Sequence, residues 1–124
     1  MKKGSATLAG IFLVAFMALT LSLIVEDSNI TVNGNVNVSG TGKFILEESE
    51  FRINTTIGAN DLIVNDTANL TIISSYMTNE TLSYQVEIYD SASADILHSD
   101  FSSEVGVLLT GDSINYIYNS LASH

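Results

Sequence analysis

Two hydrophobic patterns divide the chain. Residues 5–25 (SATLAGIFLVAFMALTLSLIV) form an uncharged run, and a helix of that length matches the thickness of a membrane's hydrocarbon core. From residue 26 onward, apolar and polar residues alternate in short runs, which predicts strands. We therefore expect a basic leader over residues 1–4, a transmembrane or filament-core helix over residues 5–25 and an extracellular β-rich domain over residues 26–124.

The clearest strand pattern covers residues 29–39 (NITVNGNVNVS), where the even positions from Ile30 to Val38 are mainly apolar and the odd positions are polar. Asn33-Gly34 also suits a tight hairpin turn, so a bent single strand and a hairpin remain equally open. Further strands are expected at residues 43–47, 50–57, 61–65, 69–74, 81–89 and 104–109.

The C-terminal region shows a different spacing. Residues 90–103 are rich in Ser and Asp and predict a loop. Asp112 has the position of a helix cap, and the apolar residues after it follow helical spacing at Ile114, Ile117, Tyr118 and Leu121. This spacing predicts a short C-terminal helix packed on the sheet, with a final strand as the alternative.

The arrangement of the strands is less determined than their existence. Apolar triplets begin near Ile30, Phe44 and Leu62, each followed by a polar turn and a second strand, as in the stacked coils of a β-solenoid. The alternation and the frequent turns suit an antiparallel sandwich better. We therefore expect a small antiparallel sandwich-like domain, and keep the β-solenoid as the alternative.

Charge and cysteine content exclude several classes of function. The formal net charge is −10, there are no cysteines, and every Asp and Glu lies at residue 26 or later. A nucleic-acid partner is excluded because phosphate binding requires a basic patch. Lys2 and Lys3 before the apolar run place the N-terminus on the inner side of the membrane and the acidic part on the outer side.

Three interpretations of residues 5–25 remain open. They are a cleaved secretory signal with small residues near Thr20-Leu21-Ser22, an uncleaved single-pass anchor, and the core helix of a filament. Ala6 and Gly10 have the small-xxx-small spacing that lets apolar helices approach closely.

Lys2-Lys3-Gly4 followed directly by Ser5 and the apolar run resembles the class III signal peptide of archaeal type IV pilins and archaellins. The resemblance implies cleavage between Gly4 and Ser5 by a prepilin peptidase. It also implies residence in the cell membrane, followed by assembly with copies of the chain at the cell surface by dedicated machinery. The helix would then pack through residues that include Ala6, Gly10, Phe12 and Phe16. Bacterial pilins carry Glu where this chain has Ala9, but archaeal members generally lack that Glu.

Asparagine-linked glycosylation is the modification that the sequence favours. Six Asn-x-Ser/Thr acceptors lie in the predicted β domain, at Asn29, Asn37, Asn54, Asn65, Asn69 and Asn79. Asn29 and Asn37 fall on the polar face of the first strand, from which a glycan would project.

No catalytic motif is present, and we expect neither an enzyme nor a cofactor or metal site. The only histidines are His98 and His124, and a lone loop histidine is usually solvated. Asp90, Asp95 and Asp100 carry oxygen ligands that suit calcium but follow no EF-hand spacing. A sugar-binding surface could be built from five tyrosines, although tyrosines at this spacing more often pack in the core. They are Tyr76, Tyr84, Tyr89, Tyr116 and Tyr118.

The sequence thus predicts a structural subunit of an extracellular type IV pilus-like filament, with a glycosylated β-rich outer domain for surface adhesion. The alternative is a membrane-anchored extracellular module that binds a sugar or surface partner and does not polymerise.

Overall fold

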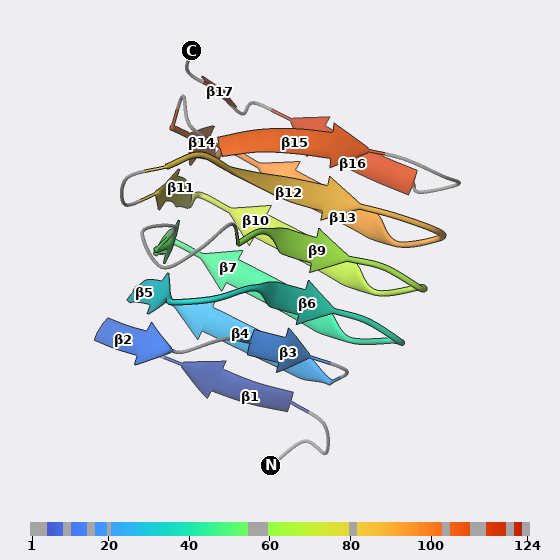
Figure 1. Cartoon of the computed structure of the whole chain (residues 1–124), viewed down its shortest axis with the longest axis horizontal. Helices are drawn as coiled ribbons and strands as arrows, with labels where there is room; N and C mark the ends of the chain where they lie inside the picture. Colours follow the sequence, from blue (N-terminus) through green and yellow to red (C-terminus); the bar gives the residue numbers. More distant parts are fainter. Residues whose placement is uncertain are drawn as a thin grey trace.

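The described part of the chain consists of β-strands and the turns between them (Figure 1). The computed structural model describes residues 5–8, 11–14, 17–19, 21–54, 60–79, 82–102, 105–109, 114–118 and 121–122, with side chains described between residues 21 and 109. Within these ranges every regular element is a strand.

The strands form three parallel sheets. In spatial order, sheet A contains β1 (Ser5–Leu8), β4 (Ser22–Glu26), β7 (Lys43–Glu47), β10 (Asn69–Ile73), β13 (Ser93–Leu97) and β16 (Ile114–Tyr118). Sheet B contains β17 (Leu121–Ala122), β14 (Asp100–Phe101), β11 (Tyr76–Asn79), β8 (Glu50–Ile53), β5 (Asn29–Val32) and β2 (Ile11–Val14). Sheet C contains β15 (Val105–Leu109), β12 (Tyr84–Ile88), β9 (Leu62–Val64), β6 (Val36–Val38) and β3 (Met17–Leu19).

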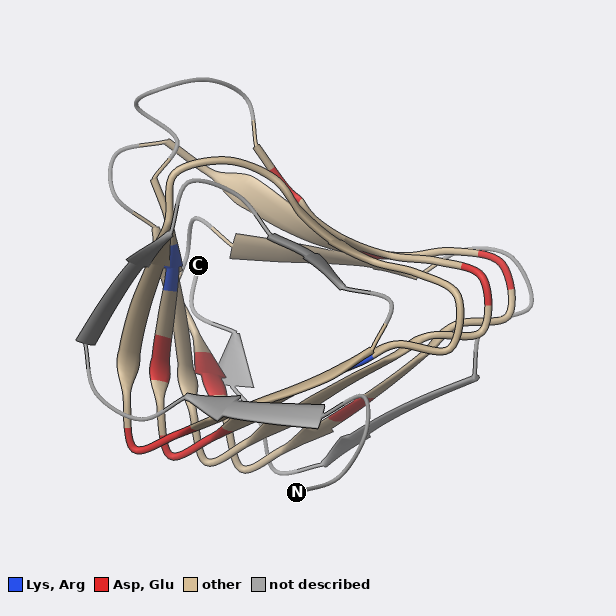
Figure 2. Cartoon of the chain, turned by 90° about the horizontal axis from the view of Figure 1, so that it is seen from below, with Lys and Arg blue, Asp and Glu red and all other residues tan. Residues whose placement is uncertain are grey.

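Each strand pairs with the strand three places later in the chain, so the backbone winds as a parallel β-solenoid. One coil passes through sheets A, B and C in turn, and the next coil lies directly on it. Figure 2 looks along the stack and shows the three sheets as the walls of a triangle. The chain therefore presents three side walls, three corners and two ends.

In β4 to β10, β12 and β13, alternate side chains fill the interior of the coil. In sheet A, one inward column runs through Leu23, Phe44, Leu70 and Ala94 in consecutive register, and all four are buried. The rings of Phe44 and Phe51 meet edge to face across a corner, with centroids 5.6 Å apart. Burying a side chain of this size stabilises the fold by about 1.5–3 kcal/mol. A slip of one residue would turn a whole column outward, so the core fixes the register of the coils.

The corner between sheets A and B, here called the serine corner, is built from residues 27–28, 48–49, 74–75 and 98–99. A residue with positive φ precedes a buried serine at all four of these positions, with φ between 47° and 50°. The backbone N–H groups of Ser28, Ser49 and Ser75 each donate to the hydroxyl of the serine in the next coil, at 3.1 Å. A continuous polar ladder therefore satisfies this buried corner.

The corner between sheets C and A, here called the aspartate corner, is built from residues 39–42, 65–68 and 89–92. Gly40, Asp66 and Asp90 occupy its left-handed position, with φ of 60°, 59° and 55°. The turn closes through hydrogen bonds of about 3 Å, such as Ala68 N–H to the Asn65 carbonyl at 3.1 Å. Unlike the serines, both aspartates are exposed.

The expected helix over residues 5–25 is wrong. The described residues of this run form β1, β2, β3 and most of β4, and the first three pair in register with β4, β5 and β6. Continuous apolar runs also occur in strands of parallel sheets, so composition and length did not distinguish the two structures. The expected packing of this helix in a pilin-like filament core is therefore also wrong, and so is the expected transmembrane helix. Ala6 lies in β1 and Phe12 in β2, whereas Gly4, Gly10 and Phe16 lie outside the described residues.

No helix long and apolar enough to cross a membrane occurs in the residues that the structure describes.

The antiparallel sandwich is also wrong, because every described strand pairing is parallel. The β-solenoid, kept as the alternative, is the observed architecture. Asn33-Gly34 is not a hairpin, because β5 pairs with β2 and β8 while β6 pairs with β3 and β9.

Two local expectations near the C-terminus fail for the same reason. The predicted loop at residues 90–103 contains β13 and β14, whose Ala94, Ile96 and Phe101 enter the core. The predicted C-terminal helix contains β16, which pairs in register with β13. The helical spacing from residue 114 falls on residues of two successive strands, β16 and β17.

Candidate functional site: the walls and one end of the coil

The sequence-predicted calcium ligands do not meet. Asp90 lies at the aspartate corner, Asp95 on the wall of sheet A and Asp100 at the start of β14 in sheet B. Among the described residues, no group of three His, Cys, Asp or Glu side chains is placed to hold a metal ion. His98 is exposed at the serine corner with a φ of 50°. A backbone role at the turn accounts for its position.

Acidic residues occupy two corners of the triangle, and others lie along its walls (Figure 2). Glu26, Asp27, Glu47 and Glu48 line the serine corner, while Asp66 and Asp90 project from the aspartate corner. The described cations are Lys43 and Arg52. Surfaces with this negative charge repel nucleic acid and other copies of the chain. Salt limits this repulsion to a range of about 8–10 Å, the Debye length.

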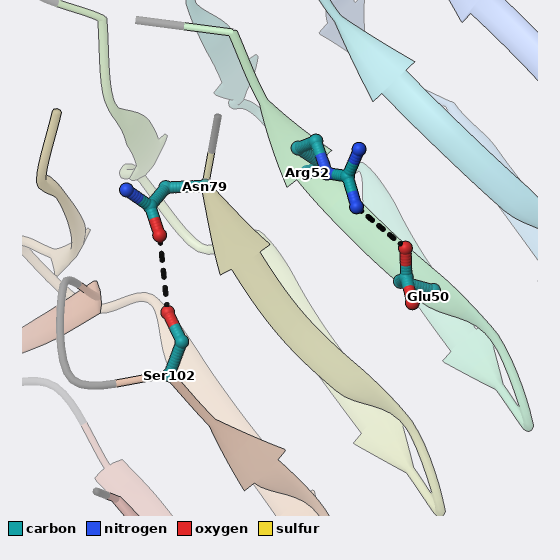
Figure 3. A network of polar contacts seen from close by, with 4 residues as sticks. All are labelled: Glu50, Arg52, Asn79 and Ser102. Carbon is teal, nitrogen blue, oxygen red and sulfur yellow. Dashed lines mark hydrogen bonds and ion pairs between the residues drawn. The ribbon is translucent and has the colours of Figure 1, made fainter. Parts of the chain in front are cut away.

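The wall of sheet B and the neighbouring corner carry a set of polar contacts (Figure 3). Arg52 Nη2 lies 3.0 Å from Glu50 Oε2 on the same strand, and both side chains are about one-third exposed. Beside them, the Ser102 hydroxyl donates to Asn79 Oδ1 at 3.3 Å. An exposed ion pair of this kind contributes about 0–1 kcal/mol, so the wall is polar without being a charged binding pocket.

The tyrosines are dispersed and do not form one adhesive surface. Tyr76 is 42% exposed on the wall of sheet B, whereas Tyr84 is buried in sheet C. Burial raises the pKa of Tyr84 well above its ordinary value. The Tyr89 hydroxyl donates to Glu87, and this hydrogen bond raises the pKa of Tyr89. Tyr116 and Tyr118 lie in β16 and their side chains are not described.

The six sequence-predicted glycosylation sites fall into two groups. Asn29 in β5 and Asn37 in β6 are exposed, as expected from the alternation. The other four asparagines are half-buried, namely Asn54, Asn65, Asn69 and Asn79. The alternation placed only Asn29 and Asn37 on an exposed face, and the acceptor motif itself does not report what surrounds the other four amides.

One end of the coil exposes apolar side chains that the sequence analysis did not single out. Val107 is 38%, Leu108 39% and Leu109 43% exposed in β15, whereas Val86 and Ile88, the neighbours of Val107 and Leu109 in β12, are fully buried. Among the described strands, β15 pairs only with β12. The sequence VGVLL contains no polar alternation, and this was the available signal.

The geometry of β15 permits one kind of contact in particular. An edge strand offers a row of backbone donors and acceptors, and a further parallel strand satisfies them while covering the apolar side chains. The fold itself repeats this pairing at every coil. The end of sheet C is thus a surface suited to a strand of the same kind.

Comparisons with known protein families, with curated proteins and with solved structures find no match for this chain.

Proposed function

We propose that the chain is a non-catalytic structural subunit of an exported cell-surface assembly, in which copies stack end to end through the coil. The observation that carries the proposal is the apolar, exposed edge strand β15. The contact replaces the helix bundle expected from the sequence as the means of assembly. Export is inferred from Lys2 and Lys3 followed by the uncharged run of residues 5–25, which resembles an export signal that is recognised before the run folds into β1–β4.

The second copy is favoured over other partners by the symmetry of the fold. Sheet C begins with β3 and ends with β15, and among the described strands each pairs on one side only. A β15 edge against the β3 edge of another copy continues the same parallel sheet at a strand spacing of about 4.8 Å. Because the two surfaces differ, the contact is heterologous and propagates instead of closing.

Charge supports end contacts over side contacts. The acidic corners run along the length of the coil, and the chain has a net charge of −10. Copies placed side by side would bring these corners together, whereas copies placed end to end bring together β15 and the uncharged β3, Met17–Leu19. The assembly is therefore expected to be a linear filament.

Sedimentation velocity and electron microscopy of the purified full chain test this assembly. The wild type is expected to form linear oligomers that lengthen with protein concentration. Leu109→Lys and Leu108→Lys place a charge at the edge and are expected to weaken association about tenfold or more, the equivalent of about 1.4 kcal/mol. Leu108 lies in register with Glu87 on the outward side of the strand, so its replacement spares the core.

Leu82→Lys is the matched control, because Leu82 is 58% exposed but lies outside β15. It is expected to assemble like the wild type, and circular dichroism verifies that all variants are folded. A wild type that stays monomeric at every concentration contradicts the proposal. So does unchanged assembly of both Leu108→Lys and Leu109→Lys.

A further inference from the structure

We infer that Asn29 and Asn37 carry asparagine-linked glycans, whereas the fold shields the other four acceptor asparagines, three through hydrogen bonds of the side-chain amide and Asn65 through burial at a turn. This inference rests on the export part of the proposed function and is independent of the end-to-end contact. It extends the distinction that the alternation drew for Asn29 and Asn37 by excluding the other four acceptor sites.

Asn29 and Asn37 have the surroundings that the modification requires. Both residues are exposed, on the outward side of β5 and β6, between inward residues that are fully or almost fully buried. Neither side-chain amide is held by a hydrogen bond to the described part of the chain, and Thr31 and Ser39 provide the hydroxyl two residues later. Their amide nitrogens are therefore open to an enzyme.

Asn69 has the opposite surroundings. Its Nδ2 donates to Ser93 Oγ at 2.8 Å and to Asp95 Oδ2 at 3.2 Å, both on the neighbouring strand β13. Its Oδ1 accepts a hydrogen bond from Thr71, the hydroxyl residue of the same acceptor motif. The amide thus links β10 to β13 on the wall of sheet A, and a glycan on Nδ2 would break these contacts.

Asn54 and Asn79 are held in a similar way at the corner between sheets B and C. Asn54 Nδ2 donates to Asn33 Oδ1 at 3.0 Å, which joins one coil to the coil before it. Asn79 Nδ2 donates to the Leu82 carbonyl at 2.9 Å, and its Oδ1 accepts from Ser102 (Figure 3). Both nitrogens are already used within the fold.

Asn65 is constrained at its oxygen. Its Oδ1 is buried, and the hydroxyl of Thr67, two residues later, donates to the Gly40 carbonyl at 3.0 Å. Asn65 Oδ1 has no hydrogen-bond partner in the described part of the chain, so burial at the turn and not a contact restricts this amide. Three of the six amides are therefore engaged by the fold, and a fourth is half-buried at the aspartate corner.

The reaction needs a co-substrate of one class, a glycosyl donor activated as a lipid-linked phosphate or diphosphate. A bond forms between Asn Nδ2 and C1 of the sugar, and the bond between C1 and the phosphate oxygen breaks. The phosphate leaves with the electron pair, and one Nδ2 proton passes to a base. No redox step is involved, and the chain contributes only an accessible amide and the hydroxyl two residues later.

The two sites occupy the walls and leave the β15 end free. Asn37 lies on β6, which is separated from β15 by β9 and β12 in sheet C. Asn29 lies on the wall of sheet B in the same coil. Glycans at these positions would cover the sides of the coil at the level of the second coil.

Glycopeptide mapping and intact-mass measurement test the inference on the full chain isolated from the surface of its native cells. We expect added mass on the peptides that contain Asn29 and Asn37, and none on those that contain the other four sites. Asn29→Gln and Asn37→Gln are each expected to remove one increment, and so is Ser39→Ala, which keeps Asn37 itself.

Asn69→Gln is the matched control. It is expected to keep both mass increments and to lower the thermal unfolding temperature, whereas Asn29→Gln and Asn37→Gln leave that temperature of the unglycosylated protein unchanged. A surface-exposed protein without glycans, or with a glycan on Asn54, Asn65, Asn69 or Asn79, overturns the inference while export stands. A protein found only inside the cell overturns both.

Discussion

The serine corner and the aspartate corner both turn the chain through a left-handed residue, but they satisfy their polar groups differently. At the serine corner, Ser49 and Ser75 are each 6% exposed, and their hydroxyls accept from the coil below and donate to a carbonyl two residues earlier. At the aspartate corner, the Gly40 N–H donates to the exposed Asp66 carboxylate at 2.8 Å. Water can replace the exposed Asp66 carboxylate as an acceptor, but it cannot reach the buried serine hydroxyls.

This difference assigns different roles to the two corners. A buried donor that loses its partner costs about 1–3 kcal/mol, so the serine corner admits few residues and fixes where each coil begins. An exposed group that loses its hydrogen-bond partner costs little stability, because water replaces the partner. The left-handed position of the aspartate corner therefore admits Gly or Asp. The comparison predicts that equal substitutions at the two corners have unequal effects.

The largest effect is expected for Ser75→Ala. This change leaves the buried Ser49 N–H without its acceptor at 3.1 Å and the Ile73 carbonyl without its donor at 2.8 Å. The free energy of unfolding is expected to fall by about 2 kcal/mol in urea titrations. Ser91→Ala, at the exposed aspartate corner, is the control and should change it by less than about 0.5 kcal/mol. Equal losses would show that burial does not distinguish the corners.

Tyr84→Phe extends the comparison to a buried hydroxyl that lacks a partner in the described part of the chain. Removing this hydroxyl is expected to raise the free energy of unfolding by about 1 kcal/mol at neutral pH, the opposite sign to Ser75→Ala. Tyr76→Phe, at an exposed tyrosine, is the matched control. It should change the free energy of unfolding by less than about 0.5 kcal/mol at neutral pH.

Alkaline titration gives Tyr84→Phe a second test. The folded state raises the pKa of Tyr84, so above about pH 10 the unfolded chain loses this proton while the folded chain keeps it. The contribution is complete below that pH and is lost above it, with a slope approaching about 1.4 kcal/mol per pH unit. The stability gap between Tyr84→Phe and wild type should therefore widen above about pH 10. A constant gap would contradict the burial of the hydroxyl.

The two corners also explain which parts of the fold the sequence predicts. Alternation is local, so the strand at residues 43–47 was predicted with the bounds of β7, and Asn29 and Asn37 were placed on the exposed side. The stacking was kept only as the alternative to the sandwich, because the offsets between coils differ and hide the repeat. The serines of the corner are separated by 21, 26 and 24 residues.

A repeat anchored on the serine would have revealed the coils. The four coils whose serine corner is described contain two alternating inward residues, then a left-handed residue and serine, then another inward residue, as in Phe44-x-Leu46-x-x-Ser49-x-Phe51. The apolar triplets near Ile30, Phe44 and Leu62 come from three different sheets and therefore have the wrong phase. Similarly, the acceptor motif identified six asparagines, but only the neighbouring coils determine which amides are engaged.

Gly40→Ala measures the backbone term that both corners share. Gly40 has a φ of 60° and no neighbour within 4 Å of an added Cβ, so the cost comes from the left-handed backbone alone. The free energy of unfolding is expected to fall by about 1 kcal/mol, and by less for Gly40→Asn, because asparagine tolerates this conformation. Gly106→Ala is the control, since its nearest atom is Gln85 Cγ at 3.8 Å and its φ is not left-handed. Equal losses at Gly40 and Gly106 would contradict the backbone origin.

The smallest effect is expected for Asp66→Asn. Asparagine keeps an oxygen that accepts from the Gly40 N–H at 2.8 Å and also tolerates the left-handed φ of 59°. Because the site is exposed, the hydrogen bond competes with water, and the lost charge acts only through screened repulsion along the acidic corner. The free energy of unfolding should change by less than about 0.5 kcal/mol in urea titrations. A loss as large as that of Ser75→Ala would mean that this corner, too, depends on a buried polar ladder, and the distinction between the corners would fail.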